Sequence, residues 1–544
     1  MQNERTTRNY EGDLAFKLSP DMELYARACA TALGGEFYTP DSNDLLNRIK
    51  TLVRMNDPMF VAQLATYIRE EQNLRAIPLV LAVELAKSHS GDDLVRRMAR
   101  RVIGRADELA RILVYYAKAN KKNWYTNQSG QLKMFTKLSN QLRKGIADAF
   151  LKFDEYQLDK WNRTYLVDDN RKDPVNNSIK LRDVLFLTHP KPLDTNQEEL
   201  FRKLAQDELV QADTWEKRMT EGKGASKRET WESLIAEKRM GYMACLKNLR
   251  NFIQEGVSPE HIEMVARYLE NTNAVRNSKQ LPFRFLAAYR ALGYNRSYAR
   301  HWYTREPEKV PVDTRDPRVR RLARALETAV LTSIENIPMF ADEKVLIAAD
   351  VSGSMQVPAT GTRDEHRAVQ MGKRQILVER FDIAILLSML LLNRCEMAAV
   401  GMFGDTFKLM KNLSRTNILE NTNKMHEREG EVGYATNGYK VLEWALKVAG
   451  KTGGFDRIMI FTDGQLWDTH GRVGRMEKLW RQYKSKVPQC KLYLFNLASY
   501  GTTPVDLQGG DVYMISGWSE KVFEVLRNIE MGAEALDTIR SIEL

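Results

Sequence analysis

Cysteine is scarce in this chain of 544 residues, and the few cysteines are widely spaced. Cys29, Cys245, Cys395 and Cys490 form no Cys-x-x-Cys pair. Because closely spaced cysteines mark zinc knuckles and disulfide-stapled domains, the sequence predicts neither of these. We expect the four thiols to be reduced.

Long hydrophobic runs are missing as well. Residues 1–10 are polar and charged, which argues against a secretory leader. The most apolar run, Phe381 to Leu392, contains Asp382 and is too short to span a bilayer, so it predicts a core helix. We therefore expect a soluble, cytoplasmic protein.

The sequence also lacks the common signatures of catalysis. Its seven histidines form no His-x-His or His-Glu-x-x-His pair. It contains neither a Gly-x-Ser-x-Gly elbow before a helix nor a glycine-rich loop that ends in Gly-Lys-Ser/Thr. We expect a binding protein rather than an enzyme.

Positive charge is in excess, but only in one part of the chain. From Ala341 onward there are 26 Lys+Arg and 26 Asp+Glu, so the whole formal net charge of +11 lies in the first 340 residues. A basic excess confined to one region suggests a polyanionic partner there, and it also fits an ordinary solvated surface. Both interpretations stay open on charge alone.

The first 300 residues have apolar side chains at helical spacing. Two stripes, within residues 45–53 and 60–68, are separated by Asp57 and Pro58, which predict the start of a helix. Pro78 opens a third apolar stretch. Successive short helices with brief connections favour a helical-repeat array, and an irregular all-α domain is the alternative.

A connector rich in proline and charge, residues 304–320, precedes a change of pattern. Beyond it, short β-favourable runs alternate with helical stretches, which predicts a parallel, doubly wound sheet. We therefore expect a helical-repeat domain over residues 1–320, a connecting helix over 321–340 and an α/β domain over 341–544.

Polar side chains follow two of the predicted strands, at the edge where open parallel sheets bind ligands. Asp350, Ser352 and Ser354 come directly after one strand, and Asp463 follows another. Thr436 lies between them in a loop flanked by glycines. Hydroxyl oxygens mixed with few carboxylates suit a hard divalent ion, so these five residues predict a site for a divalent cation, most readily Mg²⁺. A turn that holds no metal is the alternative.

At these residues the chain resembles the von Willebrand A domain and its metal-ion-dependent adhesion site. The resemblance implies that Ser352, Ser354 and Thr436 supply hydroxyl ligands, and that Asp350 and Asp463 act directly or through water. Such domains bind an acidic group of a partner and are not enzymes.

Five segments of the helical part carry a family pattern: 180–192, 214–216, 231–235, 243–251 and 280–286. Through these segments the helical part resembles the TROVE module shared by telomerase-associated, Ro and vault proteins. The helical part and the α/β domain together are most similar to a bacterial Ro-type RNA-binding protein. This resemblance implies a ring of HEAT-like repeats, closed by the von Willebrand A domain and formed by one chain.

The Ro resemblance also implies partners. Members of the family hold small noncoding Y RNA on a basic outer face, and take single-stranded ends of misfolded or decaying RNA into a central hole. The implied role is RNA quality control and turnover. In bacteria the implied partner is a 3′ exoribonuclease, polynucleotide phosphorylase.

Candidate RNA contacts follow from the same comparison and from basic stripes nearby. The family's usual Gly-Trp-Ser-His before the Arg-Asp step is replaced here by residues 177–181, Asn-Ser-Ile-Lys-Leu. A solvated helix face is the alternative for each basic residue. The candidates are Lys133, Lys137, Arg143, Lys144, Arg171, Lys172, Lys180, Arg182, His189 and Lys191.

Aromatic and arginine side chains elsewhere have an ordinary structural explanation. Trp161, like other aromatic residues at helical spacing, is expected in the core, although it could stack on a base. Arg250 and Arg284 are expected to brace helices. A second functional hypothesis stays open: a metal-dependent adaptor whose α/β domain grips an acidic protein.

Overall fold

The computed structural model describes residues 6–9, 12–30, 43–120, 124–126, 132–134, 138–166, 178–211, 213–221, 226–294, 312–334, 339–356, 378–466, 474–498, 500–519, 521–532, 534 and 536–544. The chain forms two compact units. The first contains residues 1–19, 29–32 and 215–535, and the second contains residues 20–28, 33–214 and 536–544. Among the described helices, none is long and apolar enough to cross a membrane.

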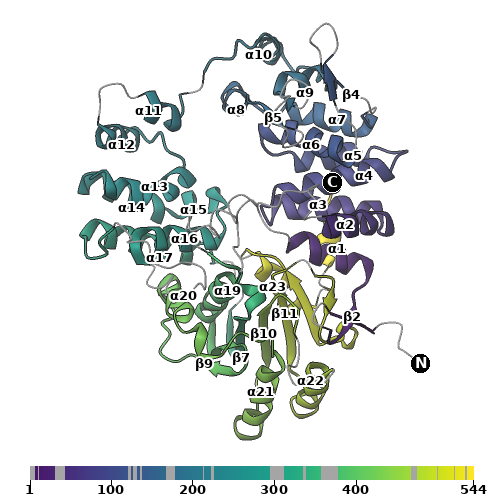
Figure 1. The fold of residues 1–544 in the computed structure, drawn as a ribbon, viewed down its shortest axis with the longest axis vertical. Helices are drawn as coiled ribbons and strands as arrows, with labels where there is room; N and C mark the ends of the chain where they lie inside the picture. The colour runs from purple at the N-terminus through teal and green to yellow at the C-terminus, as the bar shows by residue number, and fades with distance from the viewer. Residues whose placement is uncertain are drawn as a thin grey trace. The chain divides into compact units, whose positions relative to one another are not determined.

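The second unit is almost entirely helical (Figure 1). Its helices are α1 (Pro20–Cys29, of which Cys29 belongs to the other unit), α2 (Asn43–Met55), α3 (Pro58–Glu70), α4 (Ala76–Ser88), α5 (Leu94–Val102), α6 (Ala106–Ala119), α7 (Asn140–Phe150), α8 (Glu155–Lys160), α9 (Leu181–Thr188), α10 (Thr195–Gln206) and α24 (Asp537–Arg540). Two short strand pairs join them: β3 (Trp124–Thr126) with β4 (Leu132–Met134), and β5 (Tyr165–Leu166) with β6 (Ser178–Ile179).

The helix starts of this unit follow the local sequence. At α3 the Asp57 side chain accepts a hydrogen bond from the Met59 backbone, and Pro58 occupies the first turn, as predicted. Pro78, which opens the third apolar stretch, lies near the start of α4, which begins at Ala76. Pro78 lies in the first turn, where its missing N–H group costs no helical hydrogen bond.

The C-terminal residues 536–544 pack on the second unit. Gln63 of α3 donates hydrogen bonds to the carbonyl oxygens of Arg540 and Ile542, at 2.7 and 3.1 Å. Arg540 forms an ion pair with Asp21 at 2.5 Å, and Ile539 is completely buried. The last residues of the chain are therefore part of the helical core that begins at residue 20.

The first unit combines further helices with an α/β domain (Figure 1). The helices are α11 (Trp215–Glu221), α12 (Lys227–Ala236), α13 (Tyr242–Gln254), α14 (Pro259–Glu270), α15 (Thr272–Ser278), α16 (Pro282–Tyr289) with a π-helical turn η2 (Arg290–Tyr294), and α17 (Pro317–Thr332). Pro317 and its capping residue Asp316 begin α17 inside the segment predicted to be a connector.

The α/β domain has one mixed sheet with the strand order β13-β11-β10-β7-β8-β9. All neighbours are parallel except β9. The strands are β7 (Phe340–Asp350), β8 (Cys395–Phe403), β9 (Phe407–Leu409), β10 (Arg457–Thr462), β11 (Lys491–Asn496) and β13 (Val512–Ser516). The helices are α19 (Arg380–Arg394), α20 (Ile418–His426), α21 (Tyr439–Thr452), α22 (Arg475–Lys486) and α23 (Val522–Glu530).

Helices cover both faces of this sheet. Leu346, Ile458 and Leu492, on three adjacent strands, share one apolar cluster with residues of α21 and α22. On the other face the ring of Phe495 contacts that of Phe523, from α23, at 5.9 Å. The predicted fold class, mainly helical with a C-terminal doubly wound α/β domain, is confirmed.

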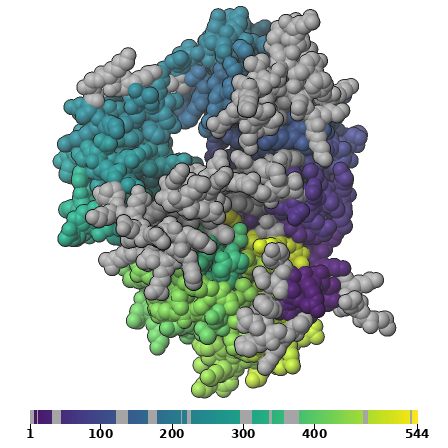
Figure 2. Space-filling model, in the orientation of Figure 1, coloured from purple at the N-terminus to yellow at the C-terminus, as the bar shows by residue number. Residues whose placement is uncertain are grey.

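An N-terminal hairpin belongs to the same unit. Strand β1 (Thr6–Arg8) pairs with β2 (Leu14–Lys17), which pairs with β12 (Thr502–Thr503). The Asn9 side chain donates to the carbonyl oxygen of Leu466 at 2.8 Å. Figure 2 shows these first residues, in dark purple, near the yellow C-terminal part of the domain.

Candidate metal centre and nucleic-acid interface

The five predicted metal-site residues lie in loops at the carboxyl edge of the α/β sheet. Asp350 is the last residue of β7, and Asp463 directly follows β10. Because β7 and β10 are parallel neighbours, both carboxylates emerge at the same edge. Asp350, Ser352 and Asp463 are completely buried.

Hydrogen bonds fix the loop after β7. One carboxylate oxygen of Asp350 accepts from the Ser352 backbone at 2.9 Å, and the other accepts from the Thr462 hydroxyl at 2.7 Å. The hydroxyls of Ser352 and Ser354 are 3.2 Å apart. The structure therefore brings two hydroxyls beside a carboxylate that is itself held in place.

The loop that carries Thr436 lies against this turn. The Gly353 backbone donates to the carbonyl oxygen of Tyr434 at 3.0 Å. One residue further on, the Ala435 backbone donates to the Asp405 carboxylate at 2.8 Å. Thr436 is half-buried next to these contacts. All five predicted residues thus belong to three neighbouring loops.

The residues present suit a divalent cation. Among the described residues, Oδ2 of Asp463 is buried with no hydrogen-bond donor, and a cation would satisfy it. Burial, and then the charge of Asp463, raise the pKa of Asp350. A bound cation would offset both of these costs.

The chemical nature of the ligand atoms limits which metal ion the site could bind. Within the described parts of the chain, no three His, Cys, Asp or Glu side chains gather as a metal site would require. The loops instead combine hydroxyls with two carboxylates, which suits Mg²⁺ or a similar hard ion. Ser352, Ser354 and Thr436 would hold it together with Asp350 and Asp463, and it would supply an open position for an anionic oxygen.

The predicted RNA contacts that the structure describes lie on α7, on α9 and just outside the two ends of α9. Nη1 of Arg143 donates to the carbonyl oxygen of Thr188 at 3.3 Å, which ties α7 to the end of α9. His189, in the left-handed region with φ of 50°, ends α9 and is exposed. The cluster contains Arg143, Lys144, Lys180, Arg182, His189 and Lys191, and we call it the α7–α9 surface.

The remaining candidates cannot be placed on this surface. Lys133 lies in β4, of which only the backbone is described. Lys137, Arg171 and Lys172 fall outside the described residues.

One aromatic residue of the α7–α9 surface escaped the sequence analysis. Phe186 of α9 is 54% exposed, and it lies one turn from both Arg182 and His189. An exposed phenylalanine among cations can stack on a base. Its helical spacing from Arg182 and His189 is the sequence pattern from which Phe186 could have been predicted.

A second basic cluster, also missed, combines arginines with aromatic rings. The Arg105 guanidinium lies 3.9 Å from the centre of the Trp161 ring, and that of Arg163 lies 5.2 Å from the same ring. Arg163 and Arg111 approach the Tyr165 ring at 5.3 and 5.8 Å. We call these five residues the arginine–aromatic cluster.

Local structure explains this arrangement. Residues 161–165 follow α8, and their alternate positions hold Trp161, Arg163 and Tyr165. Asp107 of α6 forms ion pairs with Arg105 at 2.9 Å and Arg111 at 3.0 Å. Trp161 was expected in the core but is half-buried, because arginines rather than apolar side chains cover its ring.

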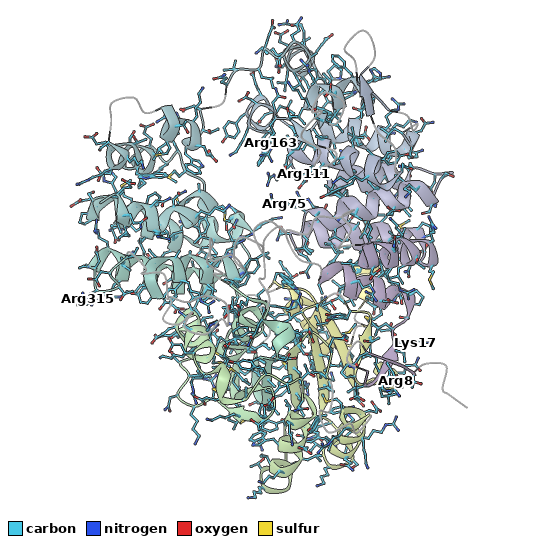
Figure 3. The ribbon with its side chains drawn as sticks, viewed as in Figure 1. Arg8, Lys17, Arg75, Arg111, Arg163 and Arg315 are labelled. Atoms are coloured by element: carbon cyan, nitrogen blue, oxygen red, sulfur yellow. The ribbon has the colours of Figure 1, made fainter. Side chains whose placement is uncertain are left out.

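The cluster continues along the helical unit. Figure 3 shows Arg75, Arg111 and Arg163 following one another along the same side of this unit. Arg75, at the start of α4, and Arg163 are exposed. The alternation of Trp, Arg and Tyr in residues 161–165 is the sequence signal that points to it.

Comparisons with known proteins identify a family pattern in residues 202–344, most of which belong to the first unit. The model of the TROVE domain family matches residues 202–344. The matched residues include α11 to α17, and the match confirms the resemblance to this family that was predicted from the sequence.

Curated relatives point to the same family. Telomerase protein component 1 of Rattus norvegicus is 24% identical over 343 residues, which are 50% of this chain and 12% of that protein. Its counterpart in Mus musculus is 23% identical over 338 residues, which are 49% of this chain and 12% of that protein. The chain thus spans about an eighth of the length of these TROVE relatives.

A solved structure extends the likeness beyond the TROVE domain. The crystal structure of the Ro (Rsr) protein of Deinococcus radiodurans aligns with a TM-score of 0.56 and 18% sequence identity. It covers 94% of this chain and 100% of the Ro chain. The chain therefore shares the fold of the Ro protein over nearly its whole length.

Proposed function

We propose that this chain is a Ro-like RNA-binding protein that acts in RNA quality control. Its α7–α9 surface would hold small noncoding RNA of the Y type, and its arginine–aromatic cluster would bind unpaired ends of misfolded or decaying RNA. A 3′ exoribonuclease such as polynucleotide phosphorylase would be the partner that degrades such ends. The observation that carries the proposal is the arginine–aromatic cluster.

The chemistry of the arginine–aromatic cluster favours single-stranded RNA. Aromatic rings and guanidinium planes stack on bases, and bases are free to stack only where the strand is unpaired. The guanidinium groups also neutralise phosphates. The location of the whole formal charge of +11 in the first 340 residues supports a polyanionic ligand for this part of the chain.

A triple substitution tests this proposal. We expect Arg105→Gln, Arg111→Gln and Arg163→Gln together to weaken binding of a short unstructured RNA by at least about tenfold, because each lost cation removes a phosphate contact. Fluorescence anisotropy at two salt concentrations should also show a less steep salt dependence.

A matched triple variant is the control. Arg228, Arg267 and Arg315 are exposed, lie beside carboxylates and are on other helices and loops. Their change to Gln removes the same net charge. Equal loss of affinity in both variants would show that charge alone, and not the arginine–aromatic cluster, binds the RNA.

The metal-dependent adaptor is a second candidate, favoured by the unsatisfied oxygen of Asp463. An adaptor would bind a protein partner only with Mg²⁺ and RNA weakly or not at all. RNA affinity that survives EDTA and falls with salt supports the RNA-binding proposal. RNA affinity that EDTA abolishes would favour the adaptor.

We propose no hydrolytic activity for the metal site. Two carboxylates and hydroxyls carry little charge for a two-metal reaction. Incubation of the protein with a structured RNA and Mg²⁺ should leave the RNA intact. Cleavage that disappears in Asp350→Ala would overturn this.

A further inference from the structure

The N-terminal hairpin, formed by β1 and β2, is held to the α/β domain by buried polar side chains. Asn9 and Asp13, between the two strands, are each only 7% exposed. The Asp13 backbone donates to Oδ1 of the Asn9 amide at 2.9 Å, and Nδ2 of the same amide donates to the carbonyl oxygen of Leu466 at 2.8 Å. Asn9 therefore links the hairpin to a residue 457 positions away in the chain.

Other contacts hold the hairpin in the same place. The Gly474 backbone, at the start of α22, donates to the Asp13 carboxylate at 3.1 Å. Strand β2 pairs with β12, so that Phe16 lies opposite Thr503, and both residues are buried. The attachment of the hairpin therefore does not depend on Asn9 alone, and Asn9 can be changed while the pairing of β2 with β12 remains.

Leu466, the partner of Asn9, comes three residues after the candidate metal ligand Asp463. The segment between them turns tightly. Gly464 has a φ of 78°, and the Gln465 backbone donates to Oδ1 of Asp463 at 3.0 Å. Oδ2 of Asp463 is then the oxygen that, among the described residues, has no donor. The orientation of this carboxylate thus depends on the residues that follow it, up to Leu466.

Leu466 also contacts the loop that carries a second candidate ligand. Its side chain is buried, and a Cβ atom added at Gly438 would lie 2.6 Å from its Cδ1 atom. A larger residue at position 438 would therefore displace Leu466. Gly438 comes two residues after Thr436. Leu466 is thus fixed by the hairpin through its backbone, and its side chain touches the loop of Thr436.

We propose that the N-terminal hairpin positions the metal centre through Asn9. The inference rests on the candidate metal centre described above. The hydrogen bond from Asn9 fixes Leu466, and Leu466 fixes the two loops that carry Asp463 and Thr436. Hydrogen bonds outside the ligand shell orient the ligands, and their loss lowers the affinity for the metal. Because linkage is reciprocal, a bound cation also strengthens the attachment of the hairpin.

The affinity of the full-length protein for Mn²⁺ tests the positioning role of Asn9. Mn²⁺ serves as the probe because electron paramagnetic resonance measures its free concentration. We expect Asn9→Ala to weaken Mn²⁺ binding about threefold to tenfold, because loss of one buried hydrogen bond loosens the loop that orients Asp463. Circular dichroism should show the same secondary structure in both proteins, since the pairing of β2 with β12 remains.

Asn393→Ala is the matched control. Asn393 donates the same kind of hydrogen bond, from its amide to the carbonyl oxygen of Arg415 at 2.8 Å. It lies at the end of α19, two residues before β8 begins, and therefore at the opposite edge of the parallel sheet. This variant should bind Mn²⁺ as tightly as the unaltered protein. Equal weakening in both variants would show a general loss of stability and would overturn the proposal.

Amide hydrogen exchange measures the same linkage from the side of the hairpin. Saturating Mn²⁺ should slow exchange in the segment Leu14 to Lys17 of the unaltered protein. The effect should vanish in Asp463→Asn, which removes one candidate ligand. Helix α14, in the same unit, should exchange equally with and without Mn²⁺. If Mn²⁺ binds and leaves exchange in the hairpin unchanged, the proposal is overturned, whether or not Asn9→Ala folds.

The results separate this inference from the metal centre itself. Weaker Mn²⁺ binding in Asn9→Ala, together with slower exchange in the hairpin on metal binding, would establish the linkage. Unchanged Mn²⁺ affinity in Asn9→Ala would overturn the role of the hairpin and leave the metal centre standing. Failure of the unaltered protein to bind Mn²⁺ would overturn both.

Discussion

Three charged side chains meet in the interior of the first unit, where the TROVE domain packs against the α/β domain. Arg290 of η2 forms two hydrogen bonds with Asp382 of α19, at 2.7 and 2.8 Å. Nδ1 of His426, at the end of α20, lies 2.7 Å from the same carboxylate. The two cations hold the pKa of Asp382 well below its usual range despite its complete burial.

Removal of this carboxylate should destabilise the protein strongly. Asp382→Asn leaves Arg290 buried without its counter-ion, so we expect the free energy of unfolding to fall by about 3–5 kcal/mol. Chemical denaturation followed by circular dichroism measures this. Asp313→Asn, which removes an exposed partner of Arg315, is the control and should unfold as the unaltered protein does.

His426 makes part of this stability depend on pH. Burial lowers the pKa of His426, but the charge and hydrogen bond of Asp382 outweigh it, so its pKa is above 6.5 in the folded protein. A raised pKa means that the contribution of His426 is complete below 6.5 and is lost as pH rises through the folded value. The stability difference between the unaltered protein and His426→Gln should therefore shrink as pH rises above 6.5. A constant difference would show that the charge is not involved.

Single residues mark the limit of what sequence predicts. The run Phe381 to Leu392 was predicted to be a core helix, and α19 buries all of it. Its charged residue Asp382 has its partner Arg290 on another domain, and no local pattern connects the two. The metal residues were predictable because strand ends place them together, whereas Asn9 and Phe186 required knowledge of burial and of the neighbouring elements.

At the scale of elements, a side chain from one helix caps another. The Glu327 carboxylate of α17 accepts hydrogen bonds from the backbone of Leu419 and Glu420, in the first turn of α20, at 3.0 and 2.9 Å. Burial raises the pKa of Glu327 to about 7, although these two hydrogen bonds lower it. The orientation of α17 and α20 thus depends on an acid that titrates near neutral pH.

Glu327→Gln should become the more stable form as pH rises. An acid with a raised pKa loses stability between its unfolded pKa of 4.5 and its folded pKa of about 7, because ionisation inside the protein is costly. The amide of Gln does not ionise. The melting temperature of Glu327→Gln should therefore rise relative to that of the unaltered protein over that pH range. Glu420→Gln is the control, since hydrogen bonds from Lys424 and Asn417 lower the pKa of Glu420. A melting-temperature difference independent of pH would contradict the prediction.

Elements were predictable where they are long and amphipathic. The helices α2 and α3 coincide with the two apolar stripes predicted from the sequence, and the strands β7, β10 and β11 lie in the part predicted to alternate strands with helices. The short hairpin β1–β2 was not predicted, because its partner β12 lies almost 500 residues away and three or four residues carry too weak a pattern.

At the scale of the whole molecule, residues 536–544 complete the helical unit. Deletion of this segment removes the buried side chains of Leu536 and Ile539 and uncovers α3. Each buried aliphatic side chain contributes about 1.5–3 kcal/mol, so we expect faster amide hydrogen exchange in α3. The strand β10, in the other unit, should exchange as before. Unchanged exchange in α3 would contradict this role of the segment.

Domain boundaries are the hardest property to read from the sequence. The predicted division at residues 320 and 341 follows a change in pattern, and it stays a prediction. The chain passes from one compact unit to the other at residues 20, 215 and 536. No shift in composition marks these positions. Where the chain passes back into an earlier unit depends on contacts between segments that are distant in the sequence.

The membership of residues 536–544 in the helical unit has a consequence for biosynthesis. Ribosomes add about 5–20 residues per second, and most domains fold as they emerge. Here the unit that starts at Pro20 acquires α24 only after residues 215–535, which form most of the other unit, have been translated. The nascent chain therefore carries an incomplete helical core while those residues are added, and its apolar surface needs shielding by chaperones during that period.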